Sequence, residues 1–331
     1  NVGQYIFEMK VYRDCDGITF STTSQTLTHH NYPALGTTTP MLLNFISITD
    51  ISPDGSPLSG NGCFDCAAGQ LGAVEEYIWR SDPITLGGTP PAEGWHFTWG
   101  SCCRSSNIDN GMSDDPWTLR AVMYPYTDPM TGNAIPADPC FDSSPEFKEQ
   151  PKTILCTGFP FSYSHNAFDE EQDSIAYTWG EPLNDLGYDY LNPNSTAIPF
   201  MSPYTYTMPI NGIVLNPITG RTYYPANQQG NYVTCTNVSA YKCGQLVAEI
   251  FREVQIVLVP PTCNLGDTTN GNFGADTLCN VRPVVQPPFF YPGTSAPFQW
   301  DTVVHCGDTV AFDFIANDND YYPNGSKQDL K

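Results

Sequence analysis

Apolar and polar residues alternate in several short stretches of this chain, which is the pattern of β-strands that bury one face. Residues 5–12 alternate with a period of two, and residues 42–51, 74–80 and 95–99 do the same. Clusters of Gly, Pro and Asn separate such stretches and are typical of turns. The pattern therefore predicts many short strands joined by turns.

One longer apolar stretch, residues 246–259, fits two periods. The spacing of Leu246, Ile250 and Val254 fits a helix. From Val254 onward, however, apolar residues alternate as in a strand. The β-branched content and the stop at Pro260-Pro261 favour a strand.

The segment 153–179 predicts a strand with a cysteine, a second strand that ends in Ala167, an acidic turn and a third strand. In the turn, Asp169, Glu171 and Asp173 fall at alternate positions, so an extended backbone would send all three carboxylates to one side. Two carboxylates about 5 Å apart repel by roughly 3 kcal/mol at an effective dielectric of about 20. A Ca²⁺ ion would remove this cost, because it accepts several oxygen ligands. The alternative is that the acidic residues are solvated and cap the local backbone.

A similar arrangement recurs near the end of the chain, where Cys306 and a strand precede Ala316, Asp318 and Asp320. Recurrence of one unit predicts tandem domains and makes Asp318 and Asp320 candidates for a second cation site. We expect a first domain at residues 1–142, a second at 143–262, a Pro/Gly-rich linker at 263–299 and an incomplete third domain at 300–331.

Composition supports an all-β protein. The 331 residues include 19 Tyr, 18 Phe, 27 Gly and 30 Pro, which favours strands and turns over helices. The predicted fold is a row of disulfide-stapled, immunoglobulin-like or cadherin-like β-sandwich domains.

The net charge is -22, from 35 acidic and 13 basic residues. Such a surface repels phosphate backbones and anionic lipids, so nucleic acid is excluded as a partner. Divalent cations, neutral glycans and cationic or abiotic surfaces stay open. The chain has no 18-residue apolar run, and we expect no direct membrane insertion.

Twelve cysteines predict structural disulfides, and disulfides predict an exported, extracellular protein. Cys63 and Cys66 have CxxC spacing, for which a redox site or half a zinc site is the alternative. Cys102 and Cys103 are adjacent, and on a strand they would face opposite ways and bridge to different partners. Cys235 and Cys243 flank a short loop that they are expected to close. The other predicted disulfide cysteines are Cys15, Cys140, Cys156, Cys263, Cys279 and Cys306.

Three aromatic residues, Trp95, Phe97 and Trp99, fall on one face of a predicted strand. A sandwich core uses such residues, and a sugar-stacking platform built on Trp95 and Trp99 is the alternative. The chain contains no G-x-S-x-G, HExxH, P-loop or GxGxxG motif. Glu75 and Glu76 are adjacent, so on a strand they would not flank one glycosidic bond. We therefore expect no catalytic residues.

Four sequence motifs resemble a module found at the start of large secreted proteins of Bacteroidetes. They are YIFEMKVYRDCDG, GWHFTWGSCCRSSNIDN, SSPEF with ILCTGFPFSYSHNAFDEEQDSIAYTW, and VAEIFREVQIVLV, in this order. Many proteins with this module carry gliding-motility-associated or type IX secretion sorting domains. In the acidic turn that family has a pattern like Asp-x-Asp-Gly-Asp, whereas this chain has Glu170, Glu171 and Gln172.

The resemblance implies a non-catalytic structural or adhesive part of a surface fibre or filament, linked to gliding motility or surface attachment. Its expected partners are other copies or domains of the same surface protein. The alternatives are a glycan-binding module of a secreted protein and an accessory domain of a secreted hydrolase.

Overall fold

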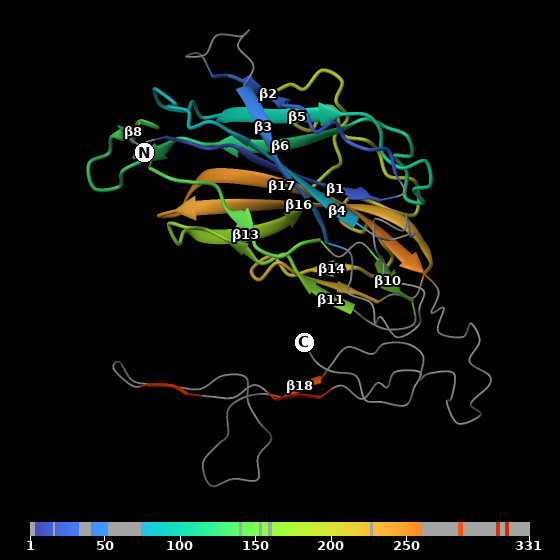
Figure 1. The fold of residues 1–331 in the computed structure, drawn as a ribbon. Coiled ribbons are helices and arrows are strands. Elements are labelled where there is room, and N and C mark those ends of the chain that lie inside the picture. The colour runs from blue at the N-terminus through green and yellow to red at the C-terminus, as the bar shows by residue number, and fades with distance from the viewer. Residues whose placement is uncertain are drawn as a thin grey trace, which may run out of the picture. The chain divides into compact units, whose positions relative to one another are not determined.

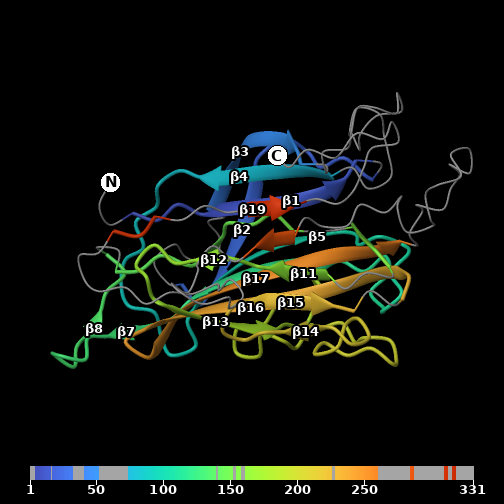
Figure 2. The same ribbon diagram turned by 90° about the horizontal axis from the view of Figure 1, so that it is seen from below.

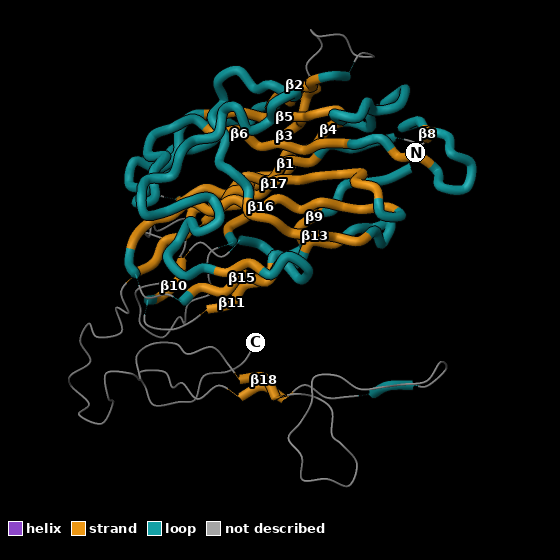
Figure 3. Tube along the Cα trace, turned by 180° about the vertical axis from the view of Figure 1, so that it is seen from behind, coloured by secondary structure: helices purple, strands orange, loops and turns teal. Residues whose placement is uncertain are grey.

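The computed structural model describes residues 4–15, 17–32, 41–51, 74–138, 141–151, 154–157, 161–225 and 228–259, with short pieces at 284–286, 309–311 and 315–317. The chain divides into two compact units, Asn1–Pro260 (unit 1) and Pro261–Lys331 (unit 2). The described parts contain strands and loops and no helix, as Figure 3 shows. None of them supplies a helix capable of crossing a membrane. The all-β prediction is confirmed.

A first layer of unit 1 consists of antiparallel strands in the order β1-β4-β3-β2. Their bounds are Glu8–Asp14 for β1, Val74–Ser81 for β4, Met41–Asp50 for β3 and Gln25–His30 for β2. Three of the strands, β1, β3 and β4, follow the alternating stretches of the sequence. Each therefore presents one row of apolar side chains to the same side.

Strand β2 belongs to both layers. Its residues Gln25, Thr26 and Leu27 pair with β3, and Thr28, His29 and His30 pair with β5. A strand that changes partners along its length forms a corner between two packed sheets. Figure 1 shows β3 and β4 running obliquely across the strands of the second layer, and Figure 2 shows β3 and β4 stacked over it.

The second layer continues in the order β2-β5-β6-β17-β16-β13. Strand β10 adds in parallel to the last residues of β17. The ambiguous stretch of the sequence is strand β17, as its β-branched content favours. The bounds are Trp95–Ser101 for β5, Trp117–Met123 for β6, Gln245–Val259 for β17, Gly230–Lys242 for β16, Ser174–Trp179 for β13 and Ile154–Cys156 for β10.

The main core lies between these layers and is rich in aromatic side chains. Tyr77 and Trp79 of the first layer stack on each other with ring centroids 5.6 Å apart. The cluster also includes Met9, Val11, Leu27, Met41, Leu43, Trp95, Phe97 and Trp99. Burying such large side chains contributes about 1.5–3 kcal/mol each.

Smaller strands and loops complete unit 1. They are β11 (Phe161–Ser164), β15 (Arg221–Tyr224) and β14 (Val214–Leu215) in one sheet, β12 (Ala167–Phe168) with β9 (Glu146–Phe147), and β7 (Tyr126–Thr127) with β8 (Ala134–Ile135). A second apolar cluster joins Tyr163 and Tyr224 of the three-stranded sheet to Ile256 of β17.

The predicted boundary at residue 142 does not separate two domains. Strand β6, before the boundary, pairs with β17, after it, for example at Ala121 and Ile250. Both predicted domains therefore share one sheet and one compact unit. Alternation defines each strand but not its partner, so it does not reveal such a long-range pairing.

Unit 2 contains an antiparallel pair, β18 (Val284–Gln286) with β19 (Ile315–Asn317). The predicted linker 263–299 and third domain 300–331 otherwise fall mostly outside the described residues.

Candidate functional site

The predicted acidic turn connects β12 to β13, and its backbone is not extended. The Gln172 N–H donates to the Asp169 carbonyl at 3.2 Å, and Gln172 has a φ of 64°. The Asp173 N–H donates to Asp169 Oδ1 at 2.9 Å. Glu171 instead accepts a 2.7 Å hydrogen bond from Ser143 Oγ. The extended backbone on which the prediction depended is therefore absent, because a tight turn replaces the expected strand.

A lysine supplies the counter-charge that the turn needs. Strands β13 and β16 pair with Ser174 opposite Tyr241, which brings Lys242 beside Asp173. Lys242 Nζ lies 2.9 Å from Asp173 Oδ2 and 2.9 Å from Asp142 Oδ1. We call Lys242, Asp142, Asp173 and Asp169 the Lys242 cluster. It joins the end of β16, the start of β13 and the chain before β9.

The carboxyl group of Asp142 is strongly affected by its surroundings. Its side chain is only 3% exposed. Burial, together with a hydrogen bond to Asp173, raises the pKa of Asp142 to about 7, although Lys242 opposes this shift. Burial acts to lower the pKa of Lys242, but its hydrogen bonds to Asp173 and Asp142 reverse the effect and raise it. Burial likewise raises the pKa of Asp169.

Apolar residues lie beside the Lys242 cluster. Phe141 precedes Asp142 and stacks on Tyr126 with ring centroids 5.8 Å apart. Both rings pack against a small cluster that includes Ala240, two residues before Lys242. The ionic groups thus lie at the edge of this apolar cluster, where electrostatic interactions are stronger than in water.

The cluster as placed does not fit the Ca²⁺ site expected from the sequence. One observation favours a further cation, because Oδ2 of buried Asp169 has no hydrogen-bond partner among the described residues. Against this, the Lys242 ammonium already lies between Asp142 and Asp173. Within the described ranges, no three His, Cys, Asp or Glu side chains are grouped as metal ligands. Asp318 and Asp320 lie outside the described residues.

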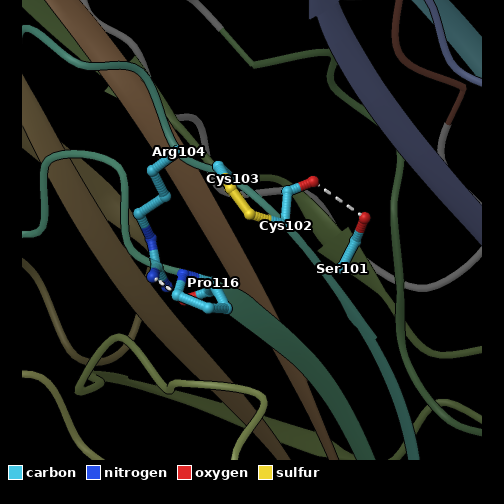
Figure 4. Close-up of a disulfide and its surroundings, with 5 residues drawn as sticks. All are labelled: Ser101, Cys102, Cys103, Arg104 and Pro116. Carbon is cyan, nitrogen blue, oxygen red and sulfur yellow. Dashed lines mark hydrogen bonds between the residues drawn. A yellow bond between two sulfur atoms is a disulfide. The ribbon is translucent and has the colours of Figure 1, made fainter.

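The cysteines divide into several groups. Cys15 is disulfide-bonded. Cys102 and Cys103 are bonded to each other, as Figure 4 shows, so the prediction of different partners is wrong. Strand β5 ends at Ser101, and the alternation of faces does not apply to the residues that follow it. Cys156 contributes its backbone to β10, while Cys63, Cys66, Cys140, Cys263, Cys279 and Cys306 lie outside the described residues.

Cys235 and Cys243 do not close a loop on themselves. Cys235 is a buried free thiol within β16, and Cys243 is an exposed free thiol in the turn after it. An extended backbone from residue 235 to residue 242 spans about 23 Å. A disulfide requires Cα atoms roughly 4.4 to 6.8 Å apart. The predicted bond fails because the residues between the two cysteines form one extended strand.

A second ion cluster lies beside the Cys102–Cys103 disulfide. Arg104 Nε and Nη2 donate to the two carboxylate oxygens of Glu253 at 2.6 and 2.7 Å. The guanidinium also donates to the carbonyls of Leu183 and Pro116, and Figure 4 shows Arg104 extending toward Pro116. We call Arg104 and Glu253 the Arg104 cluster. It ties β17 to two loops that are remote in sequence.

The two proposed sugar-stacking residues lie in the core. Trp95 is 1% exposed and Trp99 is 5% exposed. Trp99 donates from Nε1 to Gln25 at 3.1 Å. The core alternative is therefore correct, and Trp95 and Trp99 do not form a glycan platform, because both faces of β5 are covered.

The sequence did not reveal Asp142, Lys242 or Glu253 as site residues. The repulsion among the carboxylates indicates that the acidic turn needs a cation, and a lysine from another strand is one such cation. The Arg104–Glu253 pair is 149 residues apart and has no local signal.

No protein-family model matches the chain, and no curated protein does. Among solved structures, a similar one is the crystal structure of Dscam1 isoform 4.44, N-terminal four Ig domains, at 9% sequence identity. The match covers 87% of this chain and 57% of that chain, with a TM-score of 0.19. At this TM-score the likeness carries no argument about domain arrangement or function.

Proposed function

We propose that this chain is a non-catalytic structural or adhesive component of an extracellular fibre or filament. Its partners in this proposal are other copies or domains of the same surface protein, and gliding motility or surface attachment is the setting. The observation that carries the proposal is the position of β17, the last strand of unit 1.

Strand β17 is a central strand and not an edge. It pairs with β16 from Gly230 opposite Leu258 to Lys242 opposite Gln245. It also pairs with β6 and, in parallel, with β10. Hydrogen bonds in an antiparallel pair are perpendicular to the strands, so tension along β17 loads many of them together. A central last strand is therefore suited to transmit force to the following segment.

Two further features support an extracellular setting. Cys15 and the Cys102–Cys103 pair are oxidised, and disulfides persist in oxidising compartments. The net charge of -22 keeps such a surface soluble and repels anionic polymers.

The proposal is tested by stretching the full chain between its two ends in a single-molecule force experiment. We expect unit 1 to resist with a distinct force peak, because forced unfolding depends on the unfolding rate and the loaded strand is central. Two buried isoleucines of one apolar cluster, Ile256 in β17 and Ile213 outside it, provide matched variants.

Ile256→Ala and Ile213→Ala should each lower equilibrium stability by about 2–5 kcal/mol. Only Ile256→Ala should lower the unfolding force markedly, since only Ile256 lies within the loaded strand. Equal force losses in the two variants, or no peak for unit 1, would contradict a force-carrying role.

A further inference from the structure

The Lys242 cluster places an amine against a buried carboxyl group. Lys242 Nζ lies 2.9 Å from Asp142 Oδ1, an oxygen bonded to the Asp142 carboxyl carbon. On its other side Nζ lies 2.9 Å from Asp173 Oδ2. The nucleophile, its electrophile and a base thus meet in one place, as nucleophilic reactions of lysine require.

We propose that Lys242 and Asp142 condense into an intramolecular amide bond, with Asp173 as the proton acceptor. The bond would join the end of β16 to the chain that precedes β9. It would be a covalent modification of unit 1 formed by its own side chains. This inference goes beyond the proposed function and does not depend on it.

The reaction balances without another reactant. Neutral Lys242 Nζ attacks the carboxyl carbon of neutral Asp142 and forms a C–N bond. Asp173 accepts a proton from the nitrogen and passes it to the departing hydroxyl group. The C–O bond breaks, one water molecule leaves, and Asp173 returns to its starting state. No atom is oxidised or reduced.

Proximity is the main driving force for the reaction. Groups held in a reactive geometry gain effective concentrations of roughly 10⁵–10⁸ M. The raised pKa of Asp142, about 7, means that the neutral acid is present at neutral pH. The raised pKa of Lys242 makes its neutral amine the minor form, which is why a carboxylate in contact with Nζ is needed as a base.

The other lysine pairs of the described residues lack this environment. Lys148 pairs with Glu146, but their side chains are 47% and 52% exposed. Lys10 pairs with Glu8, and their side chains are 34% and 26% exposed. In those pairs water reaches both groups, whereas Asp142 is buried and follows Phe141, which packs against the apolar cluster of Ala240.

The test is the intact mass of the full chain after reduction and alkylation under denaturing conditions. The expected mass is lower by one water molecule than the mass calculated for the sequence with its cysteines alkylated. Proteolysis should then release a branched peptide that contains residues 142 and 242, identified by its fragment ions. A chain with the full calculated mass of the alkylated sequence would overturn the proposal.

Variants make the assignment specific. Lys242→Arg and Asp142→Ala should restore the full mass, and the exposed control Lys148→Arg should keep the loss of water. Asp142→Asn should lose ammonia instead of water, because an amide is then the leaving group. Asp173→Asn should slow bond formation by roughly 100-fold or more.

One artefact gives the same mass change. A succinimide at an Asp-Gly step, such as Asp16-Gly17 or Asp54-Gly55, also loses one water. It would persist in Lys242→Arg and would yield no branched peptide. A loss of water with those two properties would overturn the proposal.

Discussion

Arg104, which is buried, and Lys242, which is half-buried, both connect distant parts of unit 1, but their chemistry differs. Arg104 meets both oxygens of Glu253 and two backbone carbonyls, so nearly all its donors are used. Its guanidinium stays charged and presents a fixed planar fork. Lys242 holds two carboxyl groups with a single nitrogen and can lose a proton and react. The Arg104 cluster is therefore suited to a lasting non-covalent connection, and the Lys242 cluster to forming a covalent bond.

The largest effect is expected from Lys242→Arg. The substitution keeps a cation but removes the reactive amine. A bond between residues 142 and 242 closes a loop across 100 positions, which by chain entropy stabilises by about 4–5 kcal/mol. Urea unfolding should show a loss of this size relative to Lys148→Arg. A loss below about 1 kcal/mol, typical of a surface ion pair, would mean that Lys242 only forms a salt bridge.

A comparable loss is expected from Arg104→Met. Removing the guanidinium leaves the buried Glu253 carboxylate without a charged partner, which costs about 3–5 kcal/mol. The matched control is Arg80→Met, because Arg80 pairs with Glu8 at the surface and such pairs contribute about 0–1 kcal/mol. Equal unfolding midpoints for the two variants would contradict the conclusion that Arg104 stabilises unit 1.

A smaller loss of stability is expected when the pH is lowered, because the histidine His165 is buried. His165 contacts Thr236 at 3.3 Å and lies among aromatic rings. Burial and nearby Arg252 lower the pKa of His165 to about 3. Between that value and about 6.5, the unfolded chain binds more protons, so stability falls as the pH falls, by up to about 1.4 kcal/mol per unit.

Unfolding curves at pH 7 and at lower pH measure this slope. His165→Gln should flatten it, although His30, whose pKa burial lowers to about 4, retains part of the dependence. Curves for the variant and the parent chain with the same slope would show that His165 does not contribute.

The individual strands were predictable from the sequence because a half-buried strand carries its own local pattern. Residues 74–80 and 95–99 alternate and form most of β4 and β5. The partner of each strand was not predictable, because pairing across more than a hundred residues leaves no trace in either strand alone. The false boundary at residue 142 came from this limit.

The candidate site was predictable only in part. The acidic turn and its need for a cation followed from Asp169 and Asp173, but the identity of the cation did not. Lys242 reaches the turn through the register of β13 on β16. The Cys235–Cys243 prediction failed for the opposite reason. The two cysteines are close in sequence, but the extended strand β16 keeps them far apart in space.

The most direct test of the mechanical account is the force at which unit 1 unfolds when the full chain is stretched from its ends. We predict one clear peak that decreases in Ile256→Ala and is retained in Ile213→Ala. Extension of unit 1 without a peak, or equal weakening by both variants, would contradict the conclusion that β17 carries the load.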